Sequence, residues 1–354
     1  MKSKLFEVFK NILLLSSTLL ILFIAYIYFV IPYKIIQQGG ESQRVVTNGD
    51  DIITFDNQLG FIANENSASE RYHQKIGLRY KVTTDETGAR VKNNLQKFSN
   101  ESKSITAIGG SFTWGHGLNY EQTFSNILEE KLNVKVENYA MAGYGTLQSY
   151  RILKKKKTNS NLIIYGFIDD HINRNVMSCA HTYGIYCIKA PIVKIDRENK
   201  FYTTNKIKID NVTKMKNYSK RLKSQKLFAL ENFTLGFAYS RDSLARRLQL
   251  NENNLILSEK LDVGEYLIKK LNNHAKTLES KLLIVNVGIG QPNENFETIS
   301  KRSFDNNLFF LDASSFDTPS KELLIEIDNH PNSLGHLMIA NKIYKFIEDN
   351  NLLN

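Results

Sequence analysis

Short apolar runs alternate with stretches of helical spacing from residue 104 onward. The predicted strands are 104–108, 134–138, 162–166, 281–287 and 308–311, and the predicted helices are 121–132, 146–155, 263–279 and 333–349. This alternation predicts right-handed βαβ crossovers, and therefore a parallel sheet with helices on both faces. In such sheets the catalytic groups gather beyond the carboxyl ends of the strands.

The first 34 residues follow a different pattern. Ile12–Ile31 is a run of twenty residues without a charge, which is long enough to span a hydrocarbon core of roughly 30 Å. Three lysines precede the run and only Lys34 follows it closely, so we predict a cytoplasmic N-terminus and an extracytoplasmic body, periplasmic or at the cell surface. A cleaved signal peptide has a shorter apolar region, of about 7–15 residues, and a small-residue cleavage site. Since the run here has neither feature, we predict a retained single-pass anchor.

These patterns divide the chain into four predicted parts. They are a cytoplasmic N-terminus at 1–11, a transmembrane signal anchor at 12–32, a linker and N-terminal extension at 33–103, and an α/β domain at 104–354. Residues 34–60 are polar and contain the turn-forming pairs Gly39-Gly40 and Asn48-Gly49, which are typical of a linker. Residues at about 171–240 fit the alternation of strands and helices poorly, so we predict an insertion there.

Composition and charge narrow the class of protein. A hydrophobic content of 42% excludes general disorder, and two cysteines exclude a disulfide-dense scaffold or a cysteine-rich metal site. The net charge of +10 divides into +3 for residues 1–34, +9 for 189–226 and −2 for the remainder. The +9 segment is expected to be either a flexible cap that attracts an anionic polymer or membrane surface, or a solvated loop without a partner. Outside the cytoplasm, a disulfide between Cys179 and Cys187 is favoured over two free thiols.

Three loops carry residues suited to acyl chemistry. Gly109–Gly115 (GGSFTWG) places Ser111 in a glycine turn after the first strand, where backbone amides can face an oxyanion. The loop 140–145 (AMAGYG) follows the next strand. The loop 328–336 (DNHPNSLGH) contains His330 with a carboxylate two residues upstream. An imidazole can take the proton of the serine, and the acid orients the ring and stabilises its charged form.

Together and in this order, the three loops resemble the SGNH (GDSL-type) hydrolase family over residues 104–351. The resemblance implies a three-layer α/β/α sandwich with a parallel, flavodoxin-like sheet. It also implies that Ser111 is the nucleophile and that His330 and Asp328 complete a catalytic triad. The backbone amides of Ser111 and Gly143 would then line the oxyanion hole.

The sequence departs from the family pattern at three places. Gly110 stands where the family most often has aspartate. The acid–histidine spacing is D-x-H rather than D-x-x-H, which leaves Glu326 as an alternative acid. The asparagine that usually donates to the oxyanion is replaced by Asp170, with Asp169 as the alternative register. An ionised carboxylate cannot donate a hydrogen bond, so we expect a protonated Asp170, Asn173 or another group in its place, or a hole made by the two backbone amides alone.

The resemblance implies a membrane-anchored serine esterase that acts on oxygen esters, such as O-acetyl groups of cell-surface carbohydrate. An O-acetyltransferase with the same acyl-enzyme and an inactive tethered carbohydrate-binding domain are the alternatives. We expect no cofactor, because no P-loop or dinucleotide fingerprint occurs. We expect no nucleic-acid partner, because the body of the protein is predicted to lie outside the cytoplasm. We also expect no metal, since the run 169–171 (DDH) is more typical of a hydrogen-bond network, and His116 and His336 are predicted to be structural.

Overall fold

Five parallel strands form the centre of the fold in the computed structural model. The structure describes residues 2–26, 46–92, 103–204 and 255–353, with gaps at 51, 74–75, 179–181, 184–185, 188–189, 197, 199, 304 and 327. The order of the five strands is β8-β7-β9-β14-β15, and they span Lys135–Asn138, Ser104–Gly109, Leu162–Phe167, Lys281–Asn286 and Leu308–Asp312. In order of appearance along the chain this is the 2-1-3-4-5 arrangement of flavodoxin-like sheets. The α/β class predicted from the apolar runs is confirmed.

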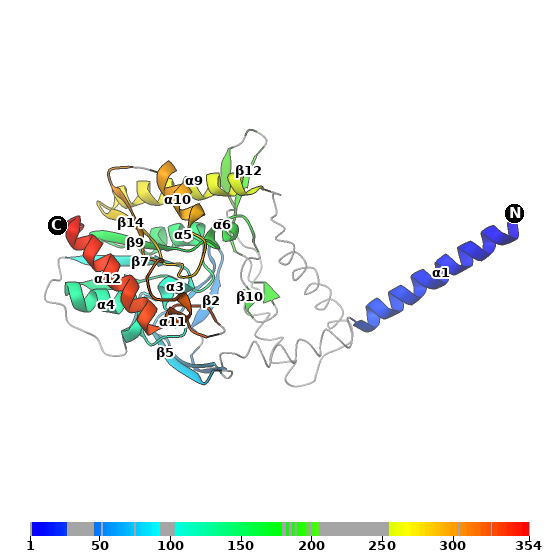
Figure 1. The fold of residues 1–354 in the computed structure, drawn as a ribbon, viewed down its shortest axis with the longest axis horizontal. Helices are drawn as coiled ribbons and strands as arrows, with labels where there is room; N and C mark the ends of the chain where they lie inside the picture. The colour runs from blue at the N-terminus through cyan, green and yellow to red at the C-terminus, as the bar shows by residue number, and fades with distance from the viewer. Residues whose placement is uncertain are drawn as a thin grey trace.

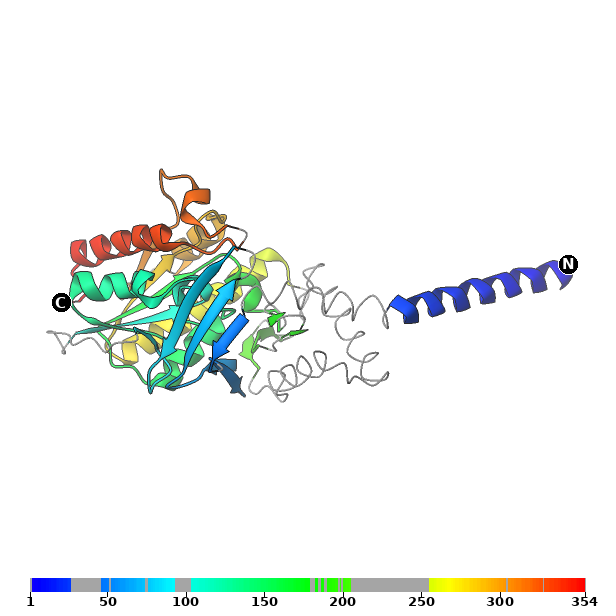
Figure 2. The ribbon, with the colours of Figure 1, turned by 90° about the horizontal axis from the view of Figure 1, so that it is seen from below.

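Helices cover both faces of this sheet (Figures 1 and 2). They are α4 (Phe124–Leu132) and α12 (Ser333–Asp349) on one face, and α5 (Thr146–Lys156), α9 (Leu257–Thr277) and α10 (Glu294–Arg302) on the other. β9 joins the two cores, because successive side chains of a strand point to opposite faces. Leu162 and Ile164 belong to the core under α4 and α12, whereas Ile163 and Tyr165 belong to the core under α5 and α9. The result is a three-layer sandwich.

The helices α4 and α12 each begin at a side-chain cap. Thr123 accepts a hydrogen bond from the amide of Asn126 at the start of α4. Asn332 accepts one of 3.0 Å from the amide of Gly335 at the start of α12. Such caps satisfy amides that have no partner within the helix and define where the helix begins. The start of each helix is therefore fixed at a defined residue.

Residues 46–92 extend the sheet with further strands. The sequence predicts a linker as far as residue 60, whereas the structure has strands from residue 46 onward. Antiparallel strands add the order β1-β4-β5-β6 beside β8, and they span Val46–Gly49, Ala68–His73, Leu78–Thr84 and Arg90–Val91. In β5, the inward residues Tyr80 and Val82 alternate with the exposed Arg79 and Lys81. This period of two identifies a half-buried strand.

A hairpin closes the sandwich beneath α5. It is formed by β2 (Ile53–Asp56) and β3 (Gly60–Ala63). The Tyr144 hydroxyl donates to the carbonyl of Phe61 at 2.6 Å, and the two rings lie 5.2 Å apart between centroids. Gln148 donates to the carbonyl of Leu59 at 2.7 Å. The N-terminal extension is therefore packed into the core of the domain.

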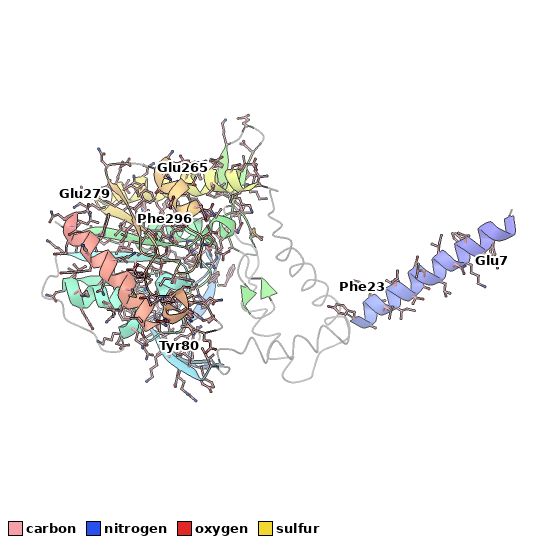
Figure 3. All side chains as sticks on the ribbon, in the orientation of Figure 1. Glu7, Phe23, Tyr80, Glu265, Glu279 and Phe296 are labelled. Carbon is pink, nitrogen blue, oxygen red and sulfur yellow. The ribbon has the colours of Figure 1, made fainter. Side chains whose placement is uncertain are left out.

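The first helix, α1 (Lys2–Ala25), lies outside these layers (Figures 1 and 3). Its segment Phe6–Ala25 has a mean hydropathy of 2.1, and none of it is buried in the protein. By length and composition it can cross a membrane. Residues 27–32 of the predicted anchor lie outside the described residues.

The predicted insertion is described only in part. It begins with the short helix α6 (His171–Arg174). Two small hairpins follow, β10–β11 at Thr182–Tyr183 and Tyr186–Cys187, and β12–β13 at Val193–Ile195 and Phe201–Thr203. Val193 packs with Leu147 and Val263, so the second hairpin is attached to the domain. Cys179 and residues 205–254 lie outside the described residues, and so do the predicted disulfide and most of the +9 segment.

Candidate active site

Ser111 lies at the carboxyl end of the central strand β7. The strand ends at Gly109, and α3 (Ser111–Trp114) begins two residues later. Ser111 is the first residue of this short helix, so its amide has no acceptor within the helix. The turn is closed by backbone hydrogen bonds of 3.0 Å from Trp114 to Gly110 and from Gly115 to Ser111. Residues 111–118, which include the predicted nucleophile, are called the nucleophile turn below.

His330 reaches Ser111 from the loop before α12. Its Nε2 lies 2.8 Å from the Ser111 Oγ, although the two residues are 219 positions apart in the sequence. On the other side of the ring, Nδ1 lies 3.2 Å from Oδ2 of Asp328, in a close contact that does not meet hydrogen-bond geometry. Catalytic contacts are often loose before substrate binds. Residues 325–332, which include the predicted base and its predicted acid, are called the acid–base loop below.

The alternative acid, Glu326, lies elsewhere in this loop. Its side chain is exposed, and it makes no hydrogen bond or ion pair with His330 among the described residues. The loop is closed by a 2.7 Å hydrogen bond from the amide of Ile325 to the carbonyl of His330. Asn329 adopts a φ of +56° at the turn between the acid and the histidine. This tight turn lets the short D-x-H spacing bring Asp328 beside His330.

A second histidine shares the acid. His116 Nε2 lies 3.5 Å from Oδ2 of Asp328, and its ring lies 4.7 Å from that of His330 between centroids. Burial, with the nearby His330 as a further cause, lowers the pKa of His116 to about 3, so this imidazole is neutral at neutral pH. Tyr80 covers it edge-on at 5.9 Å (Tyr80 is labelled in Figure 3). His116, which is predicted from the sequence to be structural, thus contacts the carboxylate beside His330.

Arg90 holds the end of the nucleophile turn from inside the protein. Its guanidinium donates to the carbonyls of Trp114 and Leu118, and to that of Gly115 at 2.7 Å. The side chain is fully buried, and burial lowers its pKa to about 10. Asn138, the partner of Arg90 across β6 and β8, donates to the carbonyl of Thr113 at 2.9 Å. Sequence reasoning missed Arg90, because a single arginine in a short polar strand gives no signal.

The second glycine loop is attached to the strand that carries the serine. The amide of Met141 donates to the carbonyl of Gly109 at 3.1 Å. Gly143 adopts a φ of +91°, a conformation that favours glycine. Its amide makes no hydrogen bond within the described residues. Gly143 therefore keeps a donor available beside the end of β7.

The acidic residues after β9 have other partners. Asp170 is bound by Arg174 at 2.6 Å and 2.8 Å, and Asp169 accepts a hydrogen bond from Asn295 at 2.5 Å. The oxygen of Asn173 accepts a hydrogen bond from Lys260 at 3.0 Å. An ion-paired carboxylate is a poor substitute for an oxyanion donor. Of the three explanations for the missing asparagine, these contacts favour a hole built from backbone amides.

His171 and Arg174 occupy the space beside Gly110. A Cβ atom on Gly110 would lie 2.7 Å from His171 Nε2 and 3.2 Å from an Arg174 nitrogen. His171 is fully buried and its Nδ1 lies 2.7 Å from the Tyr165 hydroxyl. Burial lowers its pKa well below the usual range. An aspartate at position 110, as in the family pattern, would therefore require His171 to shift.

Comparison with known proteins finds similar architecture at low sequence identity. No family model and no curated protein sequence matches the chain. A lipolytic protein of the G-D-S-L family from Desulfitobacterium hafniense DCB-2 is 12% identical, with a TM-score of 0.39, and the match covers 69% of this chain and 98% of that one. A GDSL-like lipase from Bacteroides thetaiotaomicron VPI-5482 is 10% identical, with a TM-score of 0.39 over 72% and 93% of the two chains.

A family two carbohydrate esterase from Clostridium thermocellum is also similar. It is 9% identical, with a TM-score of 0.38, and the match covers 74% of this chain and 67% of that chain. Its structure holds cellohexaose. Likeness of this degree does not extend the chemistry of these proteins to this chain, so function has to be inferred from the site itself.

Proposed function

We propose that this protein is a serine esterase of the SGNH type that cleaves oxygen esters through an acyl-enzyme. The observation that supports this most directly is the 2.8 Å contact between Ser111 Oγ and His330 Nε2, with Asp328 on the far side of the ring. A serine becomes nucleophilic when a base takes its proton as it attacks. The order of three residues, serine, imidazole and carboxylate, is the one that this chemistry requires.

In the proposed reaction, Ser111 attacks the acyl carbonyl and its proton moves to His330 Nε2. Asp328 stabilises the imidazolium that forms. The amides of Ser111 and Gly143 stabilise the tetrahedral oxyanion, where charge develops. The leaving alcohol then takes the proton from Nε2, and the acyl group stays on the serine. Water releases it by the reverse proton path, whereas attack by a sugar hydroxyl would transfer it.

The first test measures hydrolysis of p-nitrophenyl acetate and labelling by a fluorophosphonate probe. Ser111→Ala should lose both, because no nucleophile remains, and His330→Ala should reduce hydrolysis about as far. The double variant should be hardly slower than either single variant, because members of a triad act as a unit. Ser315→Ala, a change at an exposed serine, is the matched control and should behave as wild type.

The result can contradict the proposal in two ways. Wild-type turnover by Ser111→Ala would mean that another residue is the nucleophile. A wild-type protein that neither hydrolyses the ester nor takes up the probe would favour the inactive carbohydrate-binding alternative.

We further propose that α1 anchors the protein and that the catalytic domain is extracytoplasmic, where surface carbohydrate esters would be its substrates. One supporting feature is the 20-residue apolar segment Phe6–Ala25. The other is the positive charge at its amino end, where Lys2 and Lys4 precede the segment and Lys10 lies near its start. A reporter that is active only outside the cytoplasm, fused after Asn354, should be active, and the protein should stay in the membrane fraction. A reporter active only in the cytoplasm would reverse the orientation, and a shortened mature N-terminus would identify a cleaved leader.

A further inference from the structure

Two imidazoles converge on one carboxylate beside the proposed nucleophile. Asp328 Oδ2 lies 3.2 Å from His330 Nδ1 and 3.5 Å from His116 Nε2. One ligand atom from each of the three residues lies within 4.8 Å of the other two, and each side chain is about one-fifth exposed. A triad needs only one histidine at its acid. The presence of His116 there is not explained by the proposed reaction.

Two of the three separations agree with those of a metal site. Ligand atoms about 2.0–2.2 Å from a tetrahedral Zn²⁺ lie about 3.3–3.5 Å from one another. The two contacts at Asp328 have these lengths, and the third edge of the triangle is at most 4.8 Å. Two imidazole nitrogens and one carboxylate oxygen are a donor set typical of zinc sites that keep a fourth position open. Magnesium and calcium prefer oxygen ligands and fit the set poorly.

We propose that His116, Asp328 and His330 bind Zn²⁺, and that the bound ion switches the esterase off. The metal-binding part stands on the geometry alone, whereas the inhibitory part rests on the proposed function. The charges of Arg71 and Arg90 also act on His116 and oppose a second cation. The affinity is therefore expected to suit a regulatory ion that leaves readily, not a permanent structural zinc.

Inhibition follows from where the protons of His330 must be. In the working triad, Nδ1 carries the proton and faces Asp328, while the lone pair of Nε2 accepts the serine proton. Zinc binds through the lone pair of Nδ1, so the single proton of the neutral ring moves to Nε2 and no net proton is lost. Nε2 then donates to Ser111 Oγ and cannot accept from it. Zinc also takes the carboxylate that would stabilise the imidazolium.

The test of binding uses the full-length protein in detergent, freed of metal with a chelator and purified without a histidine tag. Competition with a zinc-responsive dye should give one site. His116→Gln should weaken binding by more than the roughly 10–100-fold that loss of even an outer partner of a metal costs. His274→Gln, which changes a histidine that bonds only to its own helix among the described residues, is the matched control and should bind as wild type.

Ser111→Ala separates this proposal from the proposed function. It cannot turn over substrate, yet it keeps all three ligands and should bind zinc as tightly as wild type. Binding that needs His116 in a protein without esterase activity would leave the metal site standing and would remove the proposed function. Equal zinc affinity in wild type and His116→Gln would overturn the metal site.

The test of inhibition compares each protein with itself, with and without zinc. Zinc should stop hydrolysis of p-nitrophenyl acetate and slow fluorophosphonate labelling of the wild type, and added chelator should restore both. Zinc at the same concentration should leave the residual rate of His116→Gln unchanged, whatever that rate is. Zinc that leaves the wild-type rate unchanged, or raises it, would contradict the inhibitory role.

Zinc binding can be tested even if His116→Gln does not fold. The wild type alone then decides the question, because zinc must raise its thermal unfolding temperature by binding the folded state and must slow labelling of Ser111. Magnesium at the same concentration should do neither. Equal effects of the two ions would overturn the site.

Discussion

The nucleophile turn and the acid–base loop meet at one contact, but they are held in different ways. The nucleophile turn is largely buried, and a side chain from another strand, Arg90, binds three of its carbonyls. The acid–base loop is more exposed and is closed mainly by its own backbone, as in the bond from Ile325 to His330. The proposed nucleophile is therefore held firmly, whereas the proposed base lies on a segment more able to adjust.

The side chains that bind the two segments also differ in charge. Arg90 has a pKa of about 10, so its hydrogen bonds to the nucleophile turn persist through neutral and acidic pH. The acid–base loop runs into α12, where His336 Nδ1 accepts a 3.0 Å hydrogen bond from the amide of Phe124. Burial, with the charges of Arg90 and His330, lowers the pKa of His336 to about 3. Acid should therefore loosen the acid–base side before the nucleophile side.

The largest expected effect comes from removing the arginine. Arg90→Met should lower the free energy of unfolding by about 3–5 kcal/mol, because three buried carbonyls lose their donors at about 1–3 kcal/mol each before relaxation. Displacement of the turn by even 1 Å should reduce kcat for p-nitrophenyl acetate by about 100-fold. Denaturant unfolding and steady-state kinetics measure the two effects.

Arg79→Met is the matched control for this change. Arg79 lies on β5, its side chain is 62% exposed, and its ion pair with Glu70 is 3.6 Å long. Exposed pairs of this kind contribute little, so stability should change by less than about 0.5 kcal/mol. If Arg79→Met and Arg90→Met are equally stable, the contrast between a firmly held turn and an adjustable loop is wrong.

A smaller effect should appear on the acid–base side as pH falls. The folded protein keeps His336 neutral down to about pH 3, whereas the unfolded chain takes up a proton below about pH 6.5. Between these values the unfolded state binds more protons, so stability is present above pH 6.5 and is lost as pH falls. From pH 7 to pH 5, this one histidine should cost about 2 kcal/mol.

His336→Asn tests this pH dependence directly. The side-chain oxygen of the asparagine can accept the hydrogen bond from the Phe124 amide in place of Nδ1, and the asparagine does not titrate. The variant should be less stable at pH 7 but should lose about 2 kcal/mol less than wild type between pH 7 and pH 5. Urea unfolding at the two pH values measures the difference. His274→Asn, at a partly exposed histidine, should change the pH dependence less. An unchanged slope in His336→Asn would mean that the loosening in acid starts elsewhere.

Much of the central fold could be predicted from spacing alone. The apolar runs located the five parallel strands to within one or two residues, and helix α12 has the predicted bounds 333–349. The N-terminal strands were missed because a half-buried strand such as β5 keeps half of its residues polar. The short helix α10 was missed as well, since only Phe296 and Ile299 are buried in it.

For the site, the sequence determined which residues were available and the tertiary structure decided which of them meet. Ser111, Gly143 and His330 stand in loops whose glycine turns and order along the chain can be recognised without coordinates, because they depend on local chemistry. Contacts between distant residues depend on how the strands pair, and no local pattern records that. Arg90 reaches the nucleophile turn only because β6 pairs with β8, and His116 reaches Asp328 only because two loops from opposite ends of the domain converge at the carboxyl edge of one sheet.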